Sequence, residues 1–197
     1  MRKPNVFDSA IPGDGILCAD TLDGADDMIL GMSISAFTWL HVILSLIGIA
    51  SGAVVLFGML GGKSFMSLTA LFLATTVLTS VTGFMFPSAS FGPSHIVGVI
   101  SLVVLAAAIL ALYFYRLAGA WRWIYVAGAV IALYLNVFVG VVQAFQKLSL
   151  LQPLAPTQSE PPFIVAQLAV LAIFATLGIA AVRAFHPEKL AGVAPAA

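Results

Sequence analysis

The chain alternates long stretches that contain no charged residue with short polar segments. No charge occurs from Thr38 to Leu60 or from Ser64 to Tyr115. A membrane-spanning helix needs about 20 apolar residues, so the second stretch is too long for one helix. The segment 87–93, which begins and ends with proline, divides it. The pattern therefore predicts spans at about 37–60, 64–86, 93–115, 121–147 and 163–182.

These spans predict an all-α polytopic membrane bundle of five transmembrane helices, because hydrocarbon forces backbone groups to bond within their own segment. We place the transmembrane domain at 36–186, with an acidic disordered tail at 1–35 and a short tail at 187–197. The first tail is rich in aspartate, glycine and proline, a composition that cannot bury a core. Met28 or Met32 could instead be the true first residue.

The amino-terminal sequence does not have the pattern of a cleavable signal peptide. Arg2 and Lys3 are followed by Asp, Gly and Pro and not by an apolar segment. We therefore expect the first span to act as an uncleaved signal anchor.

Composition excludes several classes of protein. Apolar residues make up 61% and charged residues 8%, whereas soluble domains have about 45–50% and 25%. The net charge of zero gives no basic surface for nucleic acid. A single cysteine, Cys18, allows no intrachain disulfide and no thiolate metal cluster. The first partner that the sequence predicts is thus the lipid bilayer.

Lysine and arginine in the short connections predict the orientation. One side of the predicted bundle carries Lys63, Arg116, Arg122, Arg183 and Lys189. The other carries Lys147, together with Arg2 and Lys3, which are too distant from a span to count for much. Because cytoplasmic loops are enriched in basic residues, we expect the N-terminus outside and the C-terminus in the cytoplasm.

With this orientation, polar residues of all the spans fall in the outer half of the membrane. Uncharged polar groups in hydrocarbon need partners and should face the bundle interior. The sequence thus predicts a polar cavity or hydrogen-bonded layer open to the outside, here called the polar layer. Its members are His41, Thr79, Thr82, His95, Asn136, Gln143 and Gln167.

His41 and His95 are the sharpest candidates for chemistry. Imidazoles at similar depth on different helices could ligate one haem b from both sides, hold copper or zinc, or carry protons beside a quinone. Each could equally bond to a neighbouring helix. Asn136 and Gln143 most often indicate interhelical hydrogen bonds, with a ligand role as the alternative.

No acidic residue occurs in a predicted span, and the basic residues Arg122 and Lys147 lie only at the ends of the fourth, which argues against an ion-driven pump. The sequence also has no P-loop, HExxH motif or nucleophile elbow. These observations favour a non-enzymatic protein. Gly48 and Gly52 have the GxxxG spacing that lets helix backbones approach.

The run Asn136–Lys147, together with Ala155–Phe163, resembles a segment of small uncharacterised bacterial membrane proteins. The resemblance covers about 30 residues and implies a bacterial inner membrane. The arrangement of two histidines among helices is similar, at the level of fold only, to b-type cytochrome subunits.

Three functions remain open. The first is a non-enzymatic protein that binds a small molecule or partner subunit at the polar layer. The second is a haem- or quinone-associated redox protein that uses His41 and His95. The third is a structural partner, in a homo-oligomer or larger complex, that packs through Gly48 and Gly52.

Overall fold

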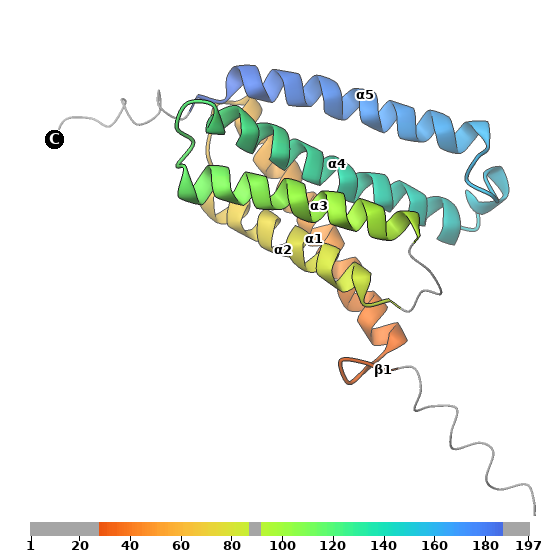
Figure 1. Cartoon of the computed structure of the whole chain (residues 1–197). Helices are drawn as coiled ribbons and strands as arrows, with labels where there is room; N and C mark the ends of the chain where they lie inside the picture. The colour runs from red at the N-terminus through yellow and green to blue at the C-terminus, as the bar shows by residue number, and fades with distance from the viewer. Residues whose placement is uncertain (1–27, 87–91, 187–197) are drawn as a thin grey trace, which may run out of the picture. The chain divides into compact units, whose positions relative to one another are not determined.

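The computed structural model describes residues 28–86 and 92–186, and it confirms the all-α fold class. Five helices are long and apolar enough to cross a membrane, and they are coloured along the chain in Figure 1. They are α1 Ile34–Leu60, α2 Met66–Phe84, α3 Pro93–Ile109 with its continuation η1 Leu110–Phe114, α4 Trp121–Lys147 and α5 Pro161–Ala184. The chain is therefore a multi-pass membrane protein.

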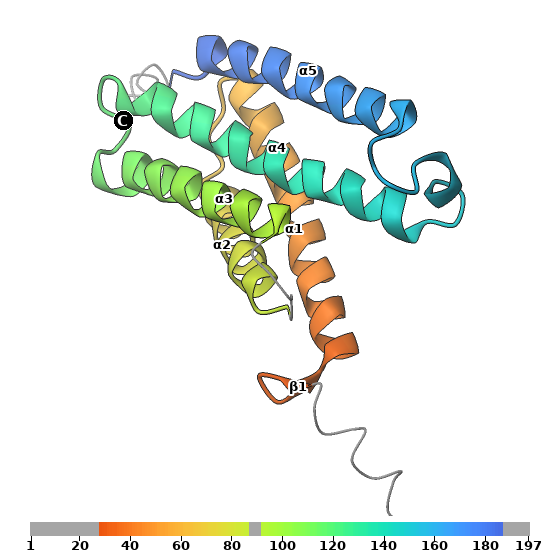
Figure 2. The same ribbon diagram turned by 45° about the vertical axis from the view of Figure 1, so that its right-hand side comes forward.

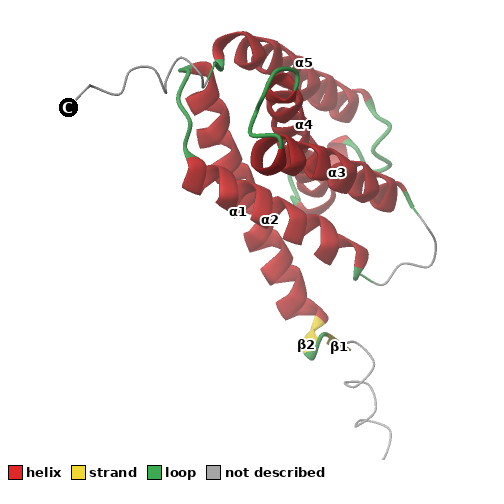
Figure 3. Cartoon of the chain, turned by 60° about the vertical axis from the view of Figure 1, so that its left-hand side comes forward, coloured by secondary structure: helices red, strands yellow, loops and turns green. Residues whose placement is uncertain are grey.

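The residues just before α1 form a small hairpin. Strand β1 (Met28–Ile29) pairs antiparallel with β2 (Met32–Ser33), as Figure 3 shows in yellow. The turn residues Leu30 and Gly31 have φ values of 53° and 77°. Two positive φ angles are typical of the type I′ turn, whose twist matches that of the strands. This hairpin lies in the range that the sequence assigned to the acidic tail, whose residues 1–27 lie outside the described part of the chain.

Helix α4 lies between two neighbours and organises the bundle. It packs against α3 on one side and α5 on the other, while α2 packs against α3 (Figures 1 and 2). Phe72, Leu105 and Val126 are fully buried where α2, α3 and α4 meet. Between α3 and α4, Gly128 permits close contact, because a Cβ there would lie 3.0 Å from the Ala108 Cβ.

The helix ends follow from local sequence. Proline begins α3 at Pro93 and α5 at Pro161, where the missing N–H costs no helical bond. After α1, the Gly62 φ of +68° and a hydrogen bond from Lys63 N to Gly58 O (2.8 Å) close the turn toward α2. Only glycine adopts such a φ without strain.

The connection from α3 to α4 is less regular than the sequence suggests. The last turn of the span widens into η1, a π-helical segment closed by the Tyr115 N–H to Leu110 O bond (3.0 Å). Arg116 and Leu117 then take φ values of 45° and 60°. Across the turn, the rings of Tyr115 and Trp121 stack with centroids 3.7 Å apart.

Candidate functional site

His41 and Thr82 join α1 to the end of α2. The His41 Nδ1 lies 2.8 Å from the Thr82 Oγ1. The Thr82 hydroxyl donates its own hydrogen to a backbone carbonyl of its helix, Leu78 O, at 2.8 Å. The imidazole must therefore donate from Nδ1, which in the neutral ring leaves Nε2 as the acceptor nitrogen.

His95 has a different role, at the start of α3. Its Nδ1 accepts a hydrogen bond from the Gly92 N–H at 3.3 Å, which satisfies a backbone donor at the helix start. Its ring packs on Phe84, with centroids 5.7 Å apart, whereas the His41 ring packs edge-on against Phe86 at 5.3 Å. The two histidine rings thus contact different phenylalanines, Phe84 at the end of α2 and Phe86 two residues later.

This placement of His95 does not fit an axial haem ligand. Because Nδ1 accepts from Gly92, the neutral imidazole carries its proton on Nε2 and has no lone pair there for a metal. Ligation through Nε2 would require the other tautomer and would break the bond to Gly92. Within residues 28–86 and 92–186, no group of three or more His, Cys, Asp or Glu side chains could hold a metal ion.

Deeper in the bundle, Asn136 of α4 meets the hydroxyls of α2. The Asn136 Nδ2 donates to the Thr76 Oγ1 at 3.4 Å, and the two residues are 8% and 0% exposed. Gly48 of α1 makes room for this contact. A Cβ at Gly48 would lie 3.1 Å from the Asn136 Nδ2 and 3.2 Å from the Thr76 Oγ1. Gly48 therefore allows α1 to approach α2 and α4 together.

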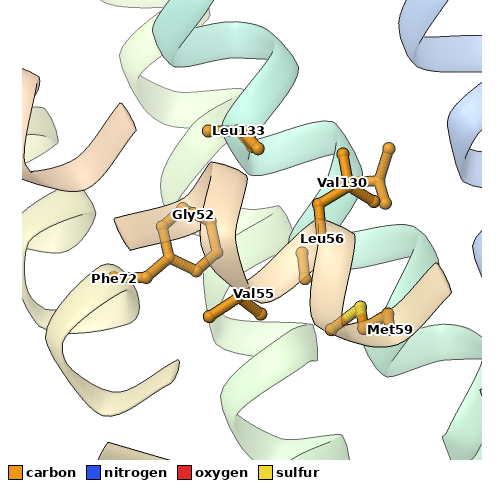
Figure 4. A pocket seen from close by; sticks show the side chains of 8 residues that line it. Gly52, Val55, Leu56, Met59, Phe72, Val130 and Leu133 are labelled. Atoms are coloured by element: carbon orange, nitrogen blue, oxygen red, sulfur yellow. The ribbon is translucent and has the colours of Figure 1, made fainter. Parts of the chain in front are cut away.

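Gly52 lies one turn further along α1 and makes room for apolar side chains in the same way. A Cβ there would lie 2.8 Å from atoms of both Phe72 and Leu133. Figure 4 shows these residues around a small pocket whose lining includes Val55 and Leu56 and which has no room for a water molecule. Gly48 and Gly52 thus lie buried inside the bundle, where they pack against α2 and α4 of the same chain.

Two further bonds connect the remaining neighbours. Ser80 of α2 and Ser101 of α3 lie with their Oγ atoms 3.0 Å apart. Gln167 of α5 donates from Nε2 to the Phe138 O of α4 at 3.2 Å. The polar side chains thus join α1 to α2, α2 to α3, α2 to α4, and α4 to α5. Sequence reasoning missed the Ser80–Ser101 pair, because helical spacing on one chain segment gives no information on which residues face each other.

Gln143 does not join the other polar side chains. It is exposed, although it lies seven residues after the buried Asn136 and the two share a helix face. Thr79 and Gln167 are buried, but the Thr79 Oγ1 and the Gln167 Oε1 have no hydrogen-bond partner in the described part of the chain. Such orphaned atoms are uncommon in folded proteins.

Arg122 connects the other end of the bundle. Its Nη1 donates to the Phe185 O and, at 3.1 Å, to the Val182 O. These carbonyls lie at the C-terminus of α5, where the helix dipole favours a cation. The Arg122 guanidinium thus holds the end of α5.

Glu160 lies in the connection between α4 and α5, where the sequence predicts a solvated side chain, with pairing to Lys147 at the end of α4 as an alternative. The Glu160 carboxylate instead accepts hydrogen bonds from the Thr157 Oγ1 (2.8 Å), the Thr157 N–H and the Ser159 N–H, both at 3.1 Å. Desolvation opposes ionisation, but these bonds outweigh it and lower the pKa of the Glu160 carboxyl. The carboxylate thus orders the loop that leads into α5.

Comparisons with protein-family models, with curated proteins and with solved structures find no match to this chain. The assignment of function therefore depends on the geometry of the described residues.

Proposed function

We propose that this chain is a non-enzymatic structural membrane protein that serves as a packing partner in a larger membrane assembly. The observation that carries the proposal is that side chains of the polar layer bond to other helices of the same chain. His41 bonds to Thr82, Asn136 to Thr76, and Gln167 to the backbone of α4. In hydrocarbon such bonds are worth about 0.6–2 kcal/mol each, and they hold helices in a fixed arrangement.

Helix α5 is the surface that we assign to the partner. It packs chiefly on α4, and of its residues only Gln167 and Ala181 are buried. Ala172, Thr176 and Ala180 are exposed and recur at every fourth position, so they lie on one face. Small residues at this spacing let another membrane helix approach closely.

The experiment is the mass of the full chain in mild detergent, corrected for bound detergent. We expect an assembly heavier than the 20.6 kDa chain for the wild type and a monomer for Ala172→Leu. The matched control is Ala106→Leu, the same change at an exposed position of α3, which should retain the assembly. A monomeric wild type in both detergent and lipid nanodiscs would refute the proposed function.

A second candidate is the binding of a small neutral molecule within the polar layer. It is favoured by the orphaned Thr79 Oγ1, since Thr79 is 8% exposed and lies on α2 between Thr76 and Thr82. A hydroxyl there could donate to, or accept from, an uncharged polar group. The candidate requires that the wild type hold such a molecule and that Thr79→Val release it.

A further inference from the structure

An apolar groove runs along the outside of α2 where it meets the end of α3. Its volume is about 460 Å³. Ala70 and Ala74, at two successive turns of α2, have small side chains that leave the groove open, and Tyr113 of η1 lines one side of it. The lining includes Ala70, Ala74, Val77, Leu78, Ile109 and Tyr113.

The length of the groove corresponds to one leaflet of a bilayer. Ala70 lies four residues after the start of α2 at Met66, and Leu78 lies twelve residues after it. At about 1.5 Å per residue, the groove extends from about 6 Å to about 18 Å along the helix. Half of the hydrocarbon core is about 15 Å thick. A partner helix would pack along the whole thickness, whereas an acyl chain of one lipid lies within a leaflet.

Cations lie near the end of this groove that is closest to the start of α2. Lys63 lies in the connection before α2, and Arg116 follows Tyr113 by three residues in the connection after η1. These two connections lie at the same end of the bundle (Figure 1). Lys63 and Arg116 are both exposed. Arg122, at the same end, already binds the carbonyls that end α5. Among residues 28–86 and 92–186 the acidic side chain is Glu160, which lies in the connection at the opposite end.

We infer that the groove binds one acyl chain of an anionic phospholipid whose phosphate is held by Lys63 and Arg116. The apolar lining accepts the chain, and the two cations select the charge of the headgroup. Basic residues beside membrane helices attract anionic lipids in this way. The partly exposed ring of Tyr113 lies between the two regions, a position that tyrosine favours at the membrane interface.

The test is native mass spectrometry of the full chain titrated with dioleoylphosphatidylglycerol or with dioleoylphosphatidylcholine. We expect tighter binding of phosphatidylglycerol. Lys63→Gln and Arg116→Asn should each weaken it by roughly fivefold and leave phosphatidylcholine unchanged. Asparagine is chosen at 116 because it tolerates the φ of 45°. The control Arg183→Gln removes a charge at the same end, on α5, and should change the affinity by less than about twofold.

A phosphatidylglycerol with a photoreactive acyl chain locates the site. We expect labelling of peptides that contain 70–78 and 109–113, and loss of this labelling in Ala74→Leu, which fills the groove. Equal affinities for the two lipids, or an equal loss in Arg183→Gln and Lys63→Gln, would overturn the inference. So would labelling that is unchanged in Ala74→Leu while that variant dissociates a protein assembly, because the groove would then hold a helix.

Discussion

The change Gly52→Ala is expected to lower the free energy of unfolding by about 1–3 kcal/mol, the usual cost of an inserted methyl in a packed core. The new Cβ would lie 2.8 Å from atoms of Phe72 and Leu133. Phe72 is 1% exposed and Leu133 2%, so neither side chain has free space into which to move. Helix α1 must then shift away from α2 and α4. The measurement is reversible unfolding of the full chain in mixed micelles.

Gly140→Ala is the matched control. Its Cβ would have the Ile49 Cδ1 at 3.9 Å as its neighbour, an ordinary contact. Alanine favours a helix over glycine by up to about 1 kcal/mol, so stability should stay the same or rise. Equal losses in Gly52→Ala and Gly140→Ala would mean that α1 is not packed as described.

The second large effect is expected for Arg122→Gln. Hydrogen bonds that involve a charged group are worth about 1.5–3 kcal/mol, and glutamine is too short to replace those to the Val182 O and the Phe185 O. The last turn of α5 should then fray. We expect lower overall stability together with faster amide hydrogen exchange in residues 178–185, measured by mass spectrometry.

Arg183→Gln separates this effect from loss of charge. Arg183 is exposed at the same end of the bundle, and its replacement should leave hydrogen exchange in α5 unchanged. If both variants accelerate exchange equally, the loss of positive charge, and not the bond from Arg122, is what loosens the end of α5.

Hydropathy was sufficient for the number and approximate bounds of the spanning helices, because in hydrocarbon a chain has few alternatives to a helix. Finer features did not follow from it. The turn at Leu30 and Gly31 has no marked hydrophobic alternation around it. The π-helical widening at η1 depends on one shifted backbone bond, for which the sequence of that segment gives no signal.

The candidate site was predicted in its residue types and only partly in its pairings. Thr82 and His41 were both named, and they bond to each other. The partner of His95 is instead the backbone of Gly92, and Gln143 is exposed. Helical spacing shows which residues of one helix share a face. It does not show how far neighbouring helices are rotated, and that rotation decides which faces meet.

The measurement that tests the central claim most directly compares Thr76→Val with Thr79→Val. If the polar layer joins the helices, Thr76→Val should reduce stability by about 0.6–2 kcal/mol through the lost bond to Asn136. Thr79→Val removes a buried hydroxyl that lacks a partner, so the variant should be at least as stable as the wild type. The small molecules extracted from the two purified proteins should also be the same. A Thr79→Val protein that unfolds more readily and has lost a molecule present at one copy per wild-type chain would contradict the account.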